Sequence, residues 1–299
     1  MKTLLLLIKR NTKLFFKDKG MFFTSLITPA ILLVLYATFL GDIYRDAFTQ
    51  GLPEGVTIAD KIIEGCVGGQ LFSSLLAVST VTVSFCSNFL MVQDKVTGAR
   101  SDLLMTPVKK STMALGYYIS SVLATMIVCL VAMGACFVYL AVNGWYLTAL
   151  DILLIVGDIF LLVMFGTALS SIINYFLNSQ GQISAVGSIV SAGYGFICGA
   201  YMPISQFGEG LQKVLSFLPG TYGTALIRNH SMRGAFAAMA EDGAPQEVVD
   251  AFHSVVDCSF EFFGNEVTTG AMYAVLIGSV VALVGIYILM NVYLRRKKK

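Results

Sequence analysis

Among the side chains of this chain that could do chemistry, the histidines and cysteines are too scattered to form a metal site. His230 and His253 are isolated from each other in the sequence and do not form a pair of metal ligands. The chain also has no Gly-x-x-x-x-Gly-Lys followed by Ser or Thr, the loop whose backbone amides hold nucleotide phosphates. We therefore expect no metal, no cofactor and no ATP hydrolysis on this chain.

Asp158 is the acidic side chain with two competing interpretations. It lies seven residues after Asp151 in an otherwise apolar stretch. A carboxylate inside a membrane-spanning helix is costly and commonly marks a proton or substrate site. Alternatively, the span begins near Ile159, and Asp158 is a solvated residue at the helix start, where the helix dipole favours a negative charge. Both interpretations fit the sequence.

A polar loop between two long apolar stretches, residues 93–111, has the most informative pattern. Charged residues lead into Gly98, which interrupts a helix because glycine costs about 1 kcal/mol relative to alanine there. A short apolar segment follows, and Pro107 ends it by forcing the residue before it toward extended geometry. The pattern predicts a helix of one or two turns, suited to a cleft on another protein. Its apolar residues are Leu103, Leu104 and Met105.

The elements that hold these residues are predicted to be membrane helices. Of 299 residues 56% are hydrophobic and 13% charged, with a mean hydropathy of +0.77, whereas soluble domains carry about 25% charged residues. About 20 apolar residues cross a bilayer as a helix, so we expect a single all-α membrane domain over residues 1–299. Its predicted spans are 21–41, 63–92, 113–142, 152–173, 183–203 and 269–293.

The basic residues predict the orientation of these spans. Fifteen of the twenty lysines and arginines fall in residues 1–20, in the loop 93–111 or in the tail after residue 293. Because such residues concentrate in cytoplasmic segments, both termini and the loop are expected to be cytoplasmic. Six spans agree with this arrangement. We expect a multi-pass protein of the cell membrane.

Residues 1–20 predict an amphipathic helix at the inner membrane surface. Lys9, Lys13 and Lys17 recur every four residues, and apolar side chains gather on the remaining arc. The apolar run is too short for a secretory signal, and no small-residue cleavage site follows it. We expect acyl chains to cover the apolar arc and anionic head groups to meet the lysines. Membrane lipids are an expected partner, and nucleic acid is not.

Two of the apolar stretches carry small residues at every fourth position, a spacing that lets membrane helices approach closely. We expect these stripes to pack helices within the subunit or across a dimer. The first stripe is Gly187, Ser191, Gly195 and Gly199, and the second is Gly270, Ala274, Gly278 and Ala282.

After Pro203 the chain is not expected simply to leave the membrane. A short amphipathic segment leads to Pro219, where the chain reverses, and a second short helix is expected to end near Arg228. Irregular backbone at membrane depth needs protein or a cavity around it. Residues 204–230 therefore predict a re-entrant helical hairpin in the outer leaflet. Residues 231–266 follow as an acidic extracellular segment.

The six cysteines do not form a disulfide framework. Four lie in the predicted spans, where they serve as small apolar residues. Cys66 and Cys258 are both predicted near or beyond the outer face. A bridge between these two and a pair of free thiols both fit the sequence.

Two motifs give the chain a resemblance to the membrane subunits of type-2 ABC exporters, a permease family that exports drugs, polysaccharides and lipids. The first is the loop 93–111, and the second lies at the end of the fifth stretch and in the predicted hairpin. Residues that match the first motif are Asp94, Lys95, Gly98, Leu103, Leu104, Thr106, Pro107 and Val108, whereas Val96 and Ala99 depart from it. Segments that match the second are 199–204, 218–222 and 225–228.

The resemblance implies a half-transporter. Two such subunits, identical or paralogous, would pair above two separate ATPase chains, which bind ATP and Mg²⁺. The loop would be the coupling helix, seated in a groove of the ATPase through Asp94, Lys95, Gly98, Leu103, Leu104, Thr106 and Pro107. The hairpin would act as an external gate or substrate funnel through Pro203, Phe207, Pro219, Tyr222 and Arg228.

Two alternatives from other functional classes stay open. A proton-coupled secondary carrier would use Asp158, but it leaves the pattern of the loop 93–111 unexplained. A membrane sensor or immunity component would bind a ligand without moving it. For an exporter, the substrate would be an amphipathic drug, peptide, lipid or glycan. The spans have no aromatic stripe suited to sugar polymers, which favours the first three.

Overall fold

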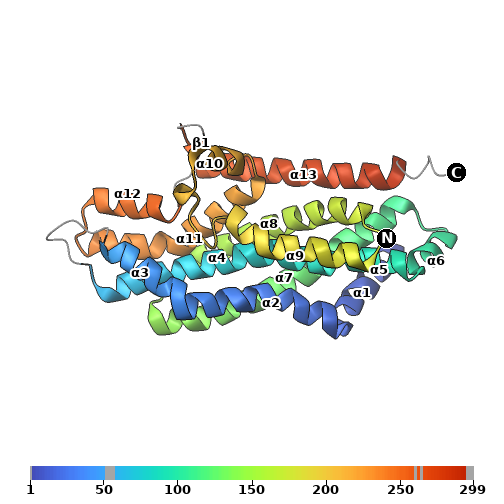
Figure 1. Ribbon diagram of the computed structural model, residues 1–299, viewed down its shortest axis with the longest axis horizontal. Coiled ribbons are helices and arrows are strands. Elements are labelled where there is room, and N and C mark those ends of the chain that lie inside the picture. The colour runs from blue at the N-terminus through green and yellow to red at the C-terminus, as the bar shows by residue number, and fades with distance from the viewer. Residues whose placement is uncertain (1, 51–57, 259–260, 263–264, 294–299) are drawn as a thin grey trace.

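The computed structural model describes residues 2–50, 58–258, 261–262 and 265–293, and the basic tail after residue 293 lies outside them. The described chain folds into an elongated bundle of helices (Figure 1). We call the end that holds α5, α6 and the N terminus the α6 end, and the end that holds α3 and α12 the α12 end. In chain order the elements are α1 (Lys2–Lys17), α2 (Lys19–Leu35), the π-helical turn η1 (Tyr36–Leu40), α3 (Gly41–Gln50), α4 (Asp60–Asn88), α5 (Leu90–Val96), α6 (Ala99–Met105), α7 (Lys110–Asn143), α8 (Ala149–Phe176), α9 (Gln180–Ile197), the 3₁₀ turn η2 (Ile204–Gln206), α10 (Glu209–Leu215), α11 (Pro219–Glu241), α12 (Gln246–Val255), the strands β1 (Glu261–Phe262) and β2 (Asn265–Glu266), and α13 (Thr269–Tyr293).

Helices long and apolar enough to cross a membrane dominate the bundle. Within the described residues there are five such stretches, namely Lys19–Thr49, Asp60–Val96, Lys110–Asn143, Ala149–Phe176 and Thr269–Tyr293. Asp60–Val96 is buried inside the bundle, and the outward faces of the other four carry large apolar side chains, a feature of surfaces that contact lipid. The predicted all-α membrane fold is therefore confirmed. The fifth predicted span, 183–203, corresponds to α9, which has 18 residues and begins Gln-Gly-Gln, so its length and composition alone do not identify a crossing.

The first span is longer than predicted. Helical structure continues from α2 through η1 into α3, although the predicted span ends at residue 41. Tyr44 and Phe48 on α3 are both buried, and the Phe48 ring packs against that of Phe252 at 4.9 Å between centroids. The helix continues because its apolar face has a protein surface to cover.

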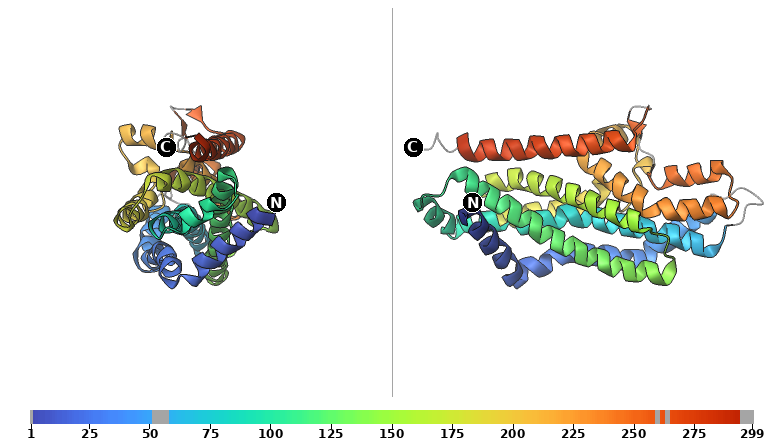
Figure 2. Two further views of the ribbon diagram at one scale, coloured as in Figure 1. Left: turned by 90° about the vertical axis from the view of Figure 1, so that its right-hand side faces the viewer. Right: turned by 180° about the vertical axis from the view of Figure 1, so that it is seen from behind.

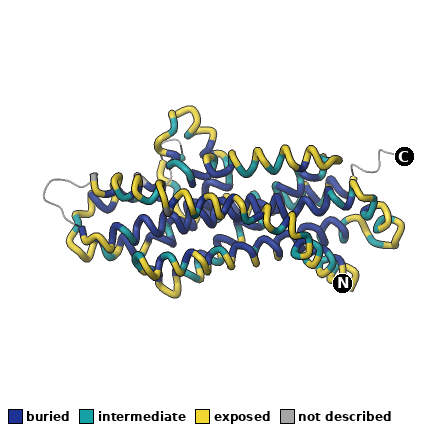
Figure 3. Tube along the Cα trace, turned by 60° about the horizontal axis from the view of Figure 1, so that its bottom comes forward, coloured by how far each residue is buried: buried dark blue, intermediate teal, exposed yellow. Residues whose placement is uncertain are grey.

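α4 and α5 form the central column of the bundle, and the tube in Figure 3 is buried along most of this column. They pack against α2, α7, α8, α9 and α11. The hydroxyls of α4 are satisfied inside the protein, since Ser79, Thr82 and Ser84 each donate to the carbonyl four residues earlier. These bonds remove the cost of burying an unpaired hydroxyl.

α1 is amphipathic, but its apolar face contacts protein and not lipid. Leu7, Asn11 and Phe15 are buried where α1 packs on α7. A Cβ added to Gly116 of α7 would lie 3.1 Å from that of Leu7, so the two helices approach closely. The expectation that acyl chains cover this face is wrong, because α7 already covers it. The opposite face exposes Leu5, Leu6 and the lysines at 2, 9, 13 and 17.

The second helix of the predicted hairpin is much longer than expected. α11 does not end near Arg228 but continues to Glu241, because the residues beyond Arg228 bury Met232, Phe236 and Met239. Its main neighbours are α4, α8 and α13, and Figure 2 shows α13 along one side of the bundle. The first third of the predicted extracellular segment, residues 231–241, therefore belongs to α11. The remainder forms α12 and the antiparallel strand pair β1–β2.

All six cysteines are free and buried, so Cys66 and Cys258 form no bridge. Burial raises the pKa of the Cys258 thiol to about 12. The thiol therefore stays protonated at neutral pH, and a protonated thiol is a poor nucleophile. These cysteines act as small apolar core residues.

Candidate functional site

Gly98 and Pro107 delimit the short helix α6 at one end of the bundle. Gly98 has φ +86°, a left-handed conformation that glycine adopts without steric cost. Thr106 is extended, as the residue before a proline tends to be. Between them α6 follows α5 and lies at the outermost end of the bundle (Figure 1).

Asp94 joins three elements at the start of this loop. Its carboxylate accepts two hydrogen bonds from Arg10 on α1, at 2.7 and 3.1 Å, and a third from the Tyr117 hydroxyl on α7 at 2.5 Å. The hydrogen bond to Asp94 is the main reason why the pKa of the Arg10 guanidinium is raised. A bidentate pair of this kind is both strong and directional. Asp94 therefore holds α1 and α7 to the segment that leads into α6.

Lys95 and Arg100 attach the loop to two further helices. The Lys95 ammonium donates to the carbonyls of Asn174, Tyr175 and Leu177 at the end of α8, at 3.0, 2.6 and 2.9 Å. A cation at these carbonyls satisfies acceptors that the helix leaves open and offsets the negative end of its dipole. Arg100 is buried and donates to the Asn291 side chain on α13 at 3.3 Å. The loop is thus braced against α1, α7, α8 and α13.

The outward face of α6 is apolar at its tip. Met105 is 88% exposed, whereas Leu103 and Leu104 are half-buried against the core. Ser101 and Asp102 are exposed one turn earlier on the same face. A rigidly braced helix with an uncovered methionine is suited to contact another protein, because methionine adapts to irregular apolar surfaces.

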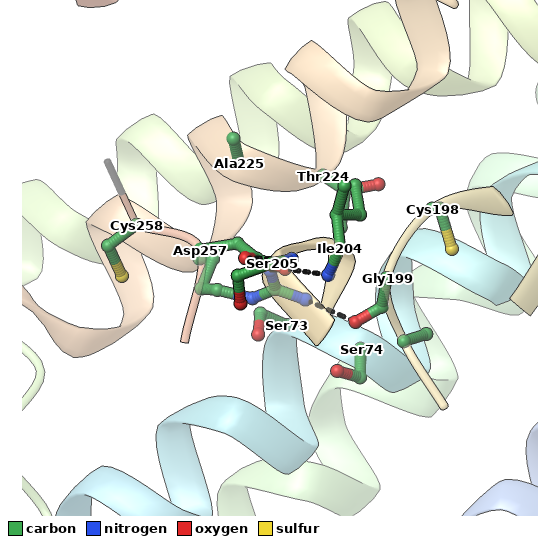
Figure 4. A network of polar contacts seen from close by, with 12 residues as sticks. Ser73, Ser74, Cys198, Gly199, Ile204, Ser205, Thr224, Ala225, Asp257 and Cys258 are labelled. Atoms are coloured by element: carbon green, nitrogen blue, oxygen red, sulfur yellow. Dashed lines mark hydrogen bonds and ion pairs between the residues drawn. The ribbon is translucent and has the colours of Figure 1, made fainter. Parts of the chain in front are cut away.

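Asp257 and Arg228 form a buried clamp over the turn that follows α9. Figure 4 shows Asp257 next to Ile204, Ser205 and Gly199 of this turn. Arg228 on α11 donates to the Gly199 carbonyl at 2.9 Å and lies 3.6 Å from the Asp257 carboxylate. That carboxylate also accepts from the backbone amides of Ile204 and Ser205, at 2.5 and 3.2 Å. Gly199 takes the left-handed φ of +69° that lets the chain reverse here. The clamp joins α9, α11 and the segment after α12.

The other residues predicted for the outer hairpin lie around this clamp and in the turn that follows it. Pro203 precedes η2, and Phe207 follows it, where its carbonyl accepts from the Gln212 amide at 2.7 Å. Pro219 is at the first turn of α11, where its missing N–H costs nothing. The Tyr222 hydroxyl donates to the Ser216 carbonyl at 2.7 Å, which ties α11 to the end of α10.

Asp158 lies inside α8 and is fully buried, so its interpretation as a solvated helix-start residue is wrong. α8 begins nine residues earlier, at Ala149, because Thr148 before it forms a capping box with Asp151. Asp158 accepts from the Tyr273 hydroxyl on α13 at 2.5 Å and lies 2.6 Å from His230 Nδ1 on α11. Two turns earlier Asp151 pairs with Arg233 at 2.6 Å. Two acid–base pairs therefore join α11 to α8.

The two predicted stripes of small residues behave differently. On α9, a Cβ at Gly187 would meet the Phe89 ring at 3.3 Å, and one at Gly195 would overlap the Tyr201 ring. Ser191 lies between them at intermediate exposure. On α13, Gly270 and Gly278 have open space where a Cβ would stand. The α9 stripe packs within the subunit, and the α13 stripe does not.

A groove of about 830 Å³ opens between α2 and α9, with α4 and α5 as its floor. Its walls combine aliphatic side chains with hydroxyls and amides, and one carboxylate, that of Asp18, lines it. Of the predicted site residues, Gly187 and Ser191 lie in this lining.

Sequence reasoning missed the residues that hold the predicted ones in place. They are Arg10, Tyr117, Asp257, His230, Tyr273 and Arg233. All but the exposed Arg233 are buried or half-buried. Four of the partners lie between 72 and 115 positions away, and those of Asp257 and Tyr117 lie 29 and 23 positions away. No local spacing signals such pairs. Within the described residues no three potential metal ligands of the His, Cys, Asp or Glu type come together.

A comparison with known protein families matches most of this chain. A family model described as "ABC-2 type transporter" matches residues 2–230, which span α1, the loop 93–111 and the first half of α11. No relative of the chain was found among the curated proteins.

Proposed function

Since the chain belongs to the ABC-2 type transporter family, we propose that it is the permease subunit of an ATP-driven exporter that moves an amphipathic substrate out of the cell. Two such subunits would pair, and separate ATPase chains would bind beneath the α6 end and supply ATP and Mg²⁺. The α6 end would then face the cytoplasm, in accordance with the basic residues of α1 and the loop 93–111.

The observation that carries the proposal is the bracing of α6. Met105 forms an exposed apolar tip at the end of α6. The residues at and just before the start of α6 bind α1, α7, α8 and α13. If ATP closed the ATPase pair and displaced α6, those ties would pass the movement to four helices at once. A ligand acts on a two-state protein in this way, by contacting one state better than the other.

The clamp of Arg228 and Asp257 would involve the outer hairpin in the same transport movement. It fixes the turn after α9 to α11, and α9 forms one wall of the groove. Release of substrate would require α9 and α11 to separate from α4 or from each other. We propose that the hairpin residues around the clamp form the outer gate.

The test of this function is a comparison of Met105→Asp with Met105→Leu. Met105 is exposed, so neither variant disturbs the fold, whereas Leu104→Asp would also disturb packing against the core. We expect Met105→Asp to lower co-purification of the co-expressed ATPase at least tenfold and to abolish ATP-driven uptake of an amphipathic dye into inverted vesicles. Met105→Leu should retain both.

Unchanged co-purification of Met105→Asp would contradict the coupling role of α6. The energy source separates the exporter from a proton-coupled carrier that uses Asp158 and His230. Transport by an exporter stops when ATP is removed and survives a proton uncoupler, and a carrier shows the reverse. A sensor would protect cells from a ligand without any transport.

A further inference from the structure

We propose that the groove between α2 and α9 binds an amphiphile with a cationic head group, and that Asp18 is the residue that selects this charge. The inference rests on the proposed function, because it names the class of substrate that the exporter would carry. It concerns binding alone and can be tested without ATP or an ATPase.

The groove has a polar end and an apolar end. Asp18 caps α2, Gln93 lies on α5 and Gln180 begins α9, and all three line the groove toward the α6 end. Farther along, the lining includes Ile31 of α2 and Ala192 of α9. A volume of about 830 Å³ lies within the range of roughly 300–1,000 Å³ that small-molecule sites occupy.

The lining of the groove carries a negative charge. Among the described residues that line the groove, Asp18 is the one charged side chain, and no lysine or arginine is among them. The neighbouring Lys17 and Lys19 are exposed and do not contribute to the lining. Asp18 Oδ1 accepts from the Met21 amide at 3.1 Å, which fixes the carboxylate in place at the groove. An anionic head group inside the groove would meet this carboxylate with no cation in the lining to offset it.

The remaining lining suits a flexible chain. Ile27, Ile31, Phe89 and Ile183 supply apolar walls on three elements, and this is the composition of pockets that bury most of a ligand. Ile27 and Ile31 are also more than half exposed, so the groove is open along its length to the surroundings of the bundle. An amphiphile can therefore enter sideways with its chain in the bilayer and its head at Asp18.

Asp18→Asn is the decisive variant, because asparagine caps a helix as well as aspartate and removes only the charge. The full chain, in nanodiscs of uncharged lipid, would be labelled with three photoreactive C12 amphiphiles that differ only in a trimethylammonium, hydroxyl or sulfonate head. We expect labelled peptides from α2 and α9, with the strongest binding for trimethylammonium. Asp18→Asn should raise its half-saturating concentration about three- to tenfold and leave the hydroxyl probe unchanged. The matched control is Asp46→Asn, an exposed acid on α3 at the other end of the same span.

The proposal would be overturned if the three probes had equal half-saturating concentrations. It would also be overturned if the Asp18→Asn variant bound the trimethylammonium probe as tightly as the natural chain does. Labels confined to other helices would do the same. A second copy of the chain could instead cover the groove. In that case Ser188→Cys would cross-link between copies and the probes would not label α9, which also overturns it. Because ATP is absent throughout, failure here leaves the coupling role of α6 to its own test.

Discussion

At the scale of single residues, the buried charges hold distant segments together. Arg228 is 1% exposed, and its guanidinium contacts the Gly199 carbonyl and the Asp257 carboxylate. Removing a charge from water costs free energy, and attraction to the partner charge offsets that cost. The buried carboxylates of Asp151 and Asp158 also have partners on α11, at 2.6 Å from Arg233 and from His230. Loss of one partner should therefore cost more than loss of a surface pair.

We predict that Arg228→Met destabilises the protein by about 3 kcal/mol, because it leaves Asp257 buried without its cation. The thermal unfolding midpoint in detergent measures the effect. Arg45→Met is the control, since the Arg45–Glu64 pair is partly exposed and such pairs contribute about 0–1 kcal/mol. Equal shifts for the two variants would show that the clamp does not stabilise the fold.

His253 gives the α12 end a dependence on pH. Its ring stacks on Phe236 at 4.1 Å, and burial lowers its pKa below the usual 6.5, while Asp250 and Glu266 oppose the shift. Between the two pKa values the unfolded state binds more protons. The contribution of His253 to stability is therefore complete above pH 6.5 and is lost as the pH falls through the folded-state pKa.

We predict that α12 exchanges its amide hydrogens faster at pH 5 than at pH 7.5, after correction for the intrinsic rates. His253→Phe keeps an aromatic ring on Phe236 and cannot titrate, so it should reduce this difference. A difference as large in the variant as in the natural protein would assign the effect to other groups.

At the scale of elements, the close approach of helices depends on a few glycines. A Cβ at Gly234 of α11 would overlap the backbone carbonyl of Tyr146, which lies in the turn between α7 and α8. A backbone carbonyl cannot rotate away as a side chain can. A Cβ at Gly278 of α13 would meet nothing within 4 Å. The two glycines therefore serve different purposes, although both lie in helices.

We predict that Gly234→Ala destabilises the protein by about 2–3 kcal/mol through overpacking. Gly278→Ala should be neutral or stabilising by up to about 1 kcal/mol in the isolated subunit, because alanine favours the helix. Thermal unfolding of both variants measures the difference. If Gly278→Ala instead lowered stability only where two copies pair, the α13 stripe would lie in the dimer interface.

At the scale of the whole molecule, the two ends of the bundle differ in charge. Exposed lysines cover α1 at the α6 end, and exposed acids cover α12 and the end of α11 at the other. The apolar outer faces of α2, α7, α8 and α13 lie between these ends. This distribution is that of a protein whose ends lie in water on opposite sides of a bilayer.

We predict that Met105→Cys reacts with an impermeant maleimide in inverted vesicles and that Glu247→Cys reacts in intact cells. The six natural cysteines are buried, so each variant carries one reactive thiol and needs no cysteine-free background. Reaction of both positions from the same side would refute the proposed orientation.

Composition and local spacing were sufficient for the class of protein, five of its long apolar helices and the short helix between Gly98 and Pro107. These depend on short-range effects, namely the length of apolar runs, glycine at a left-handed position and proline after an extended residue. The partners of Asp94, Asp158 and Arg228 depend on contacts between distant helices, as does the continuation of α11 to Glu241. A buried polar group needs a partner, but its own neighbourhood in the chain does not specify which one. Only the packing of α1, α8, α11 and α13 around α4 brings those partners together.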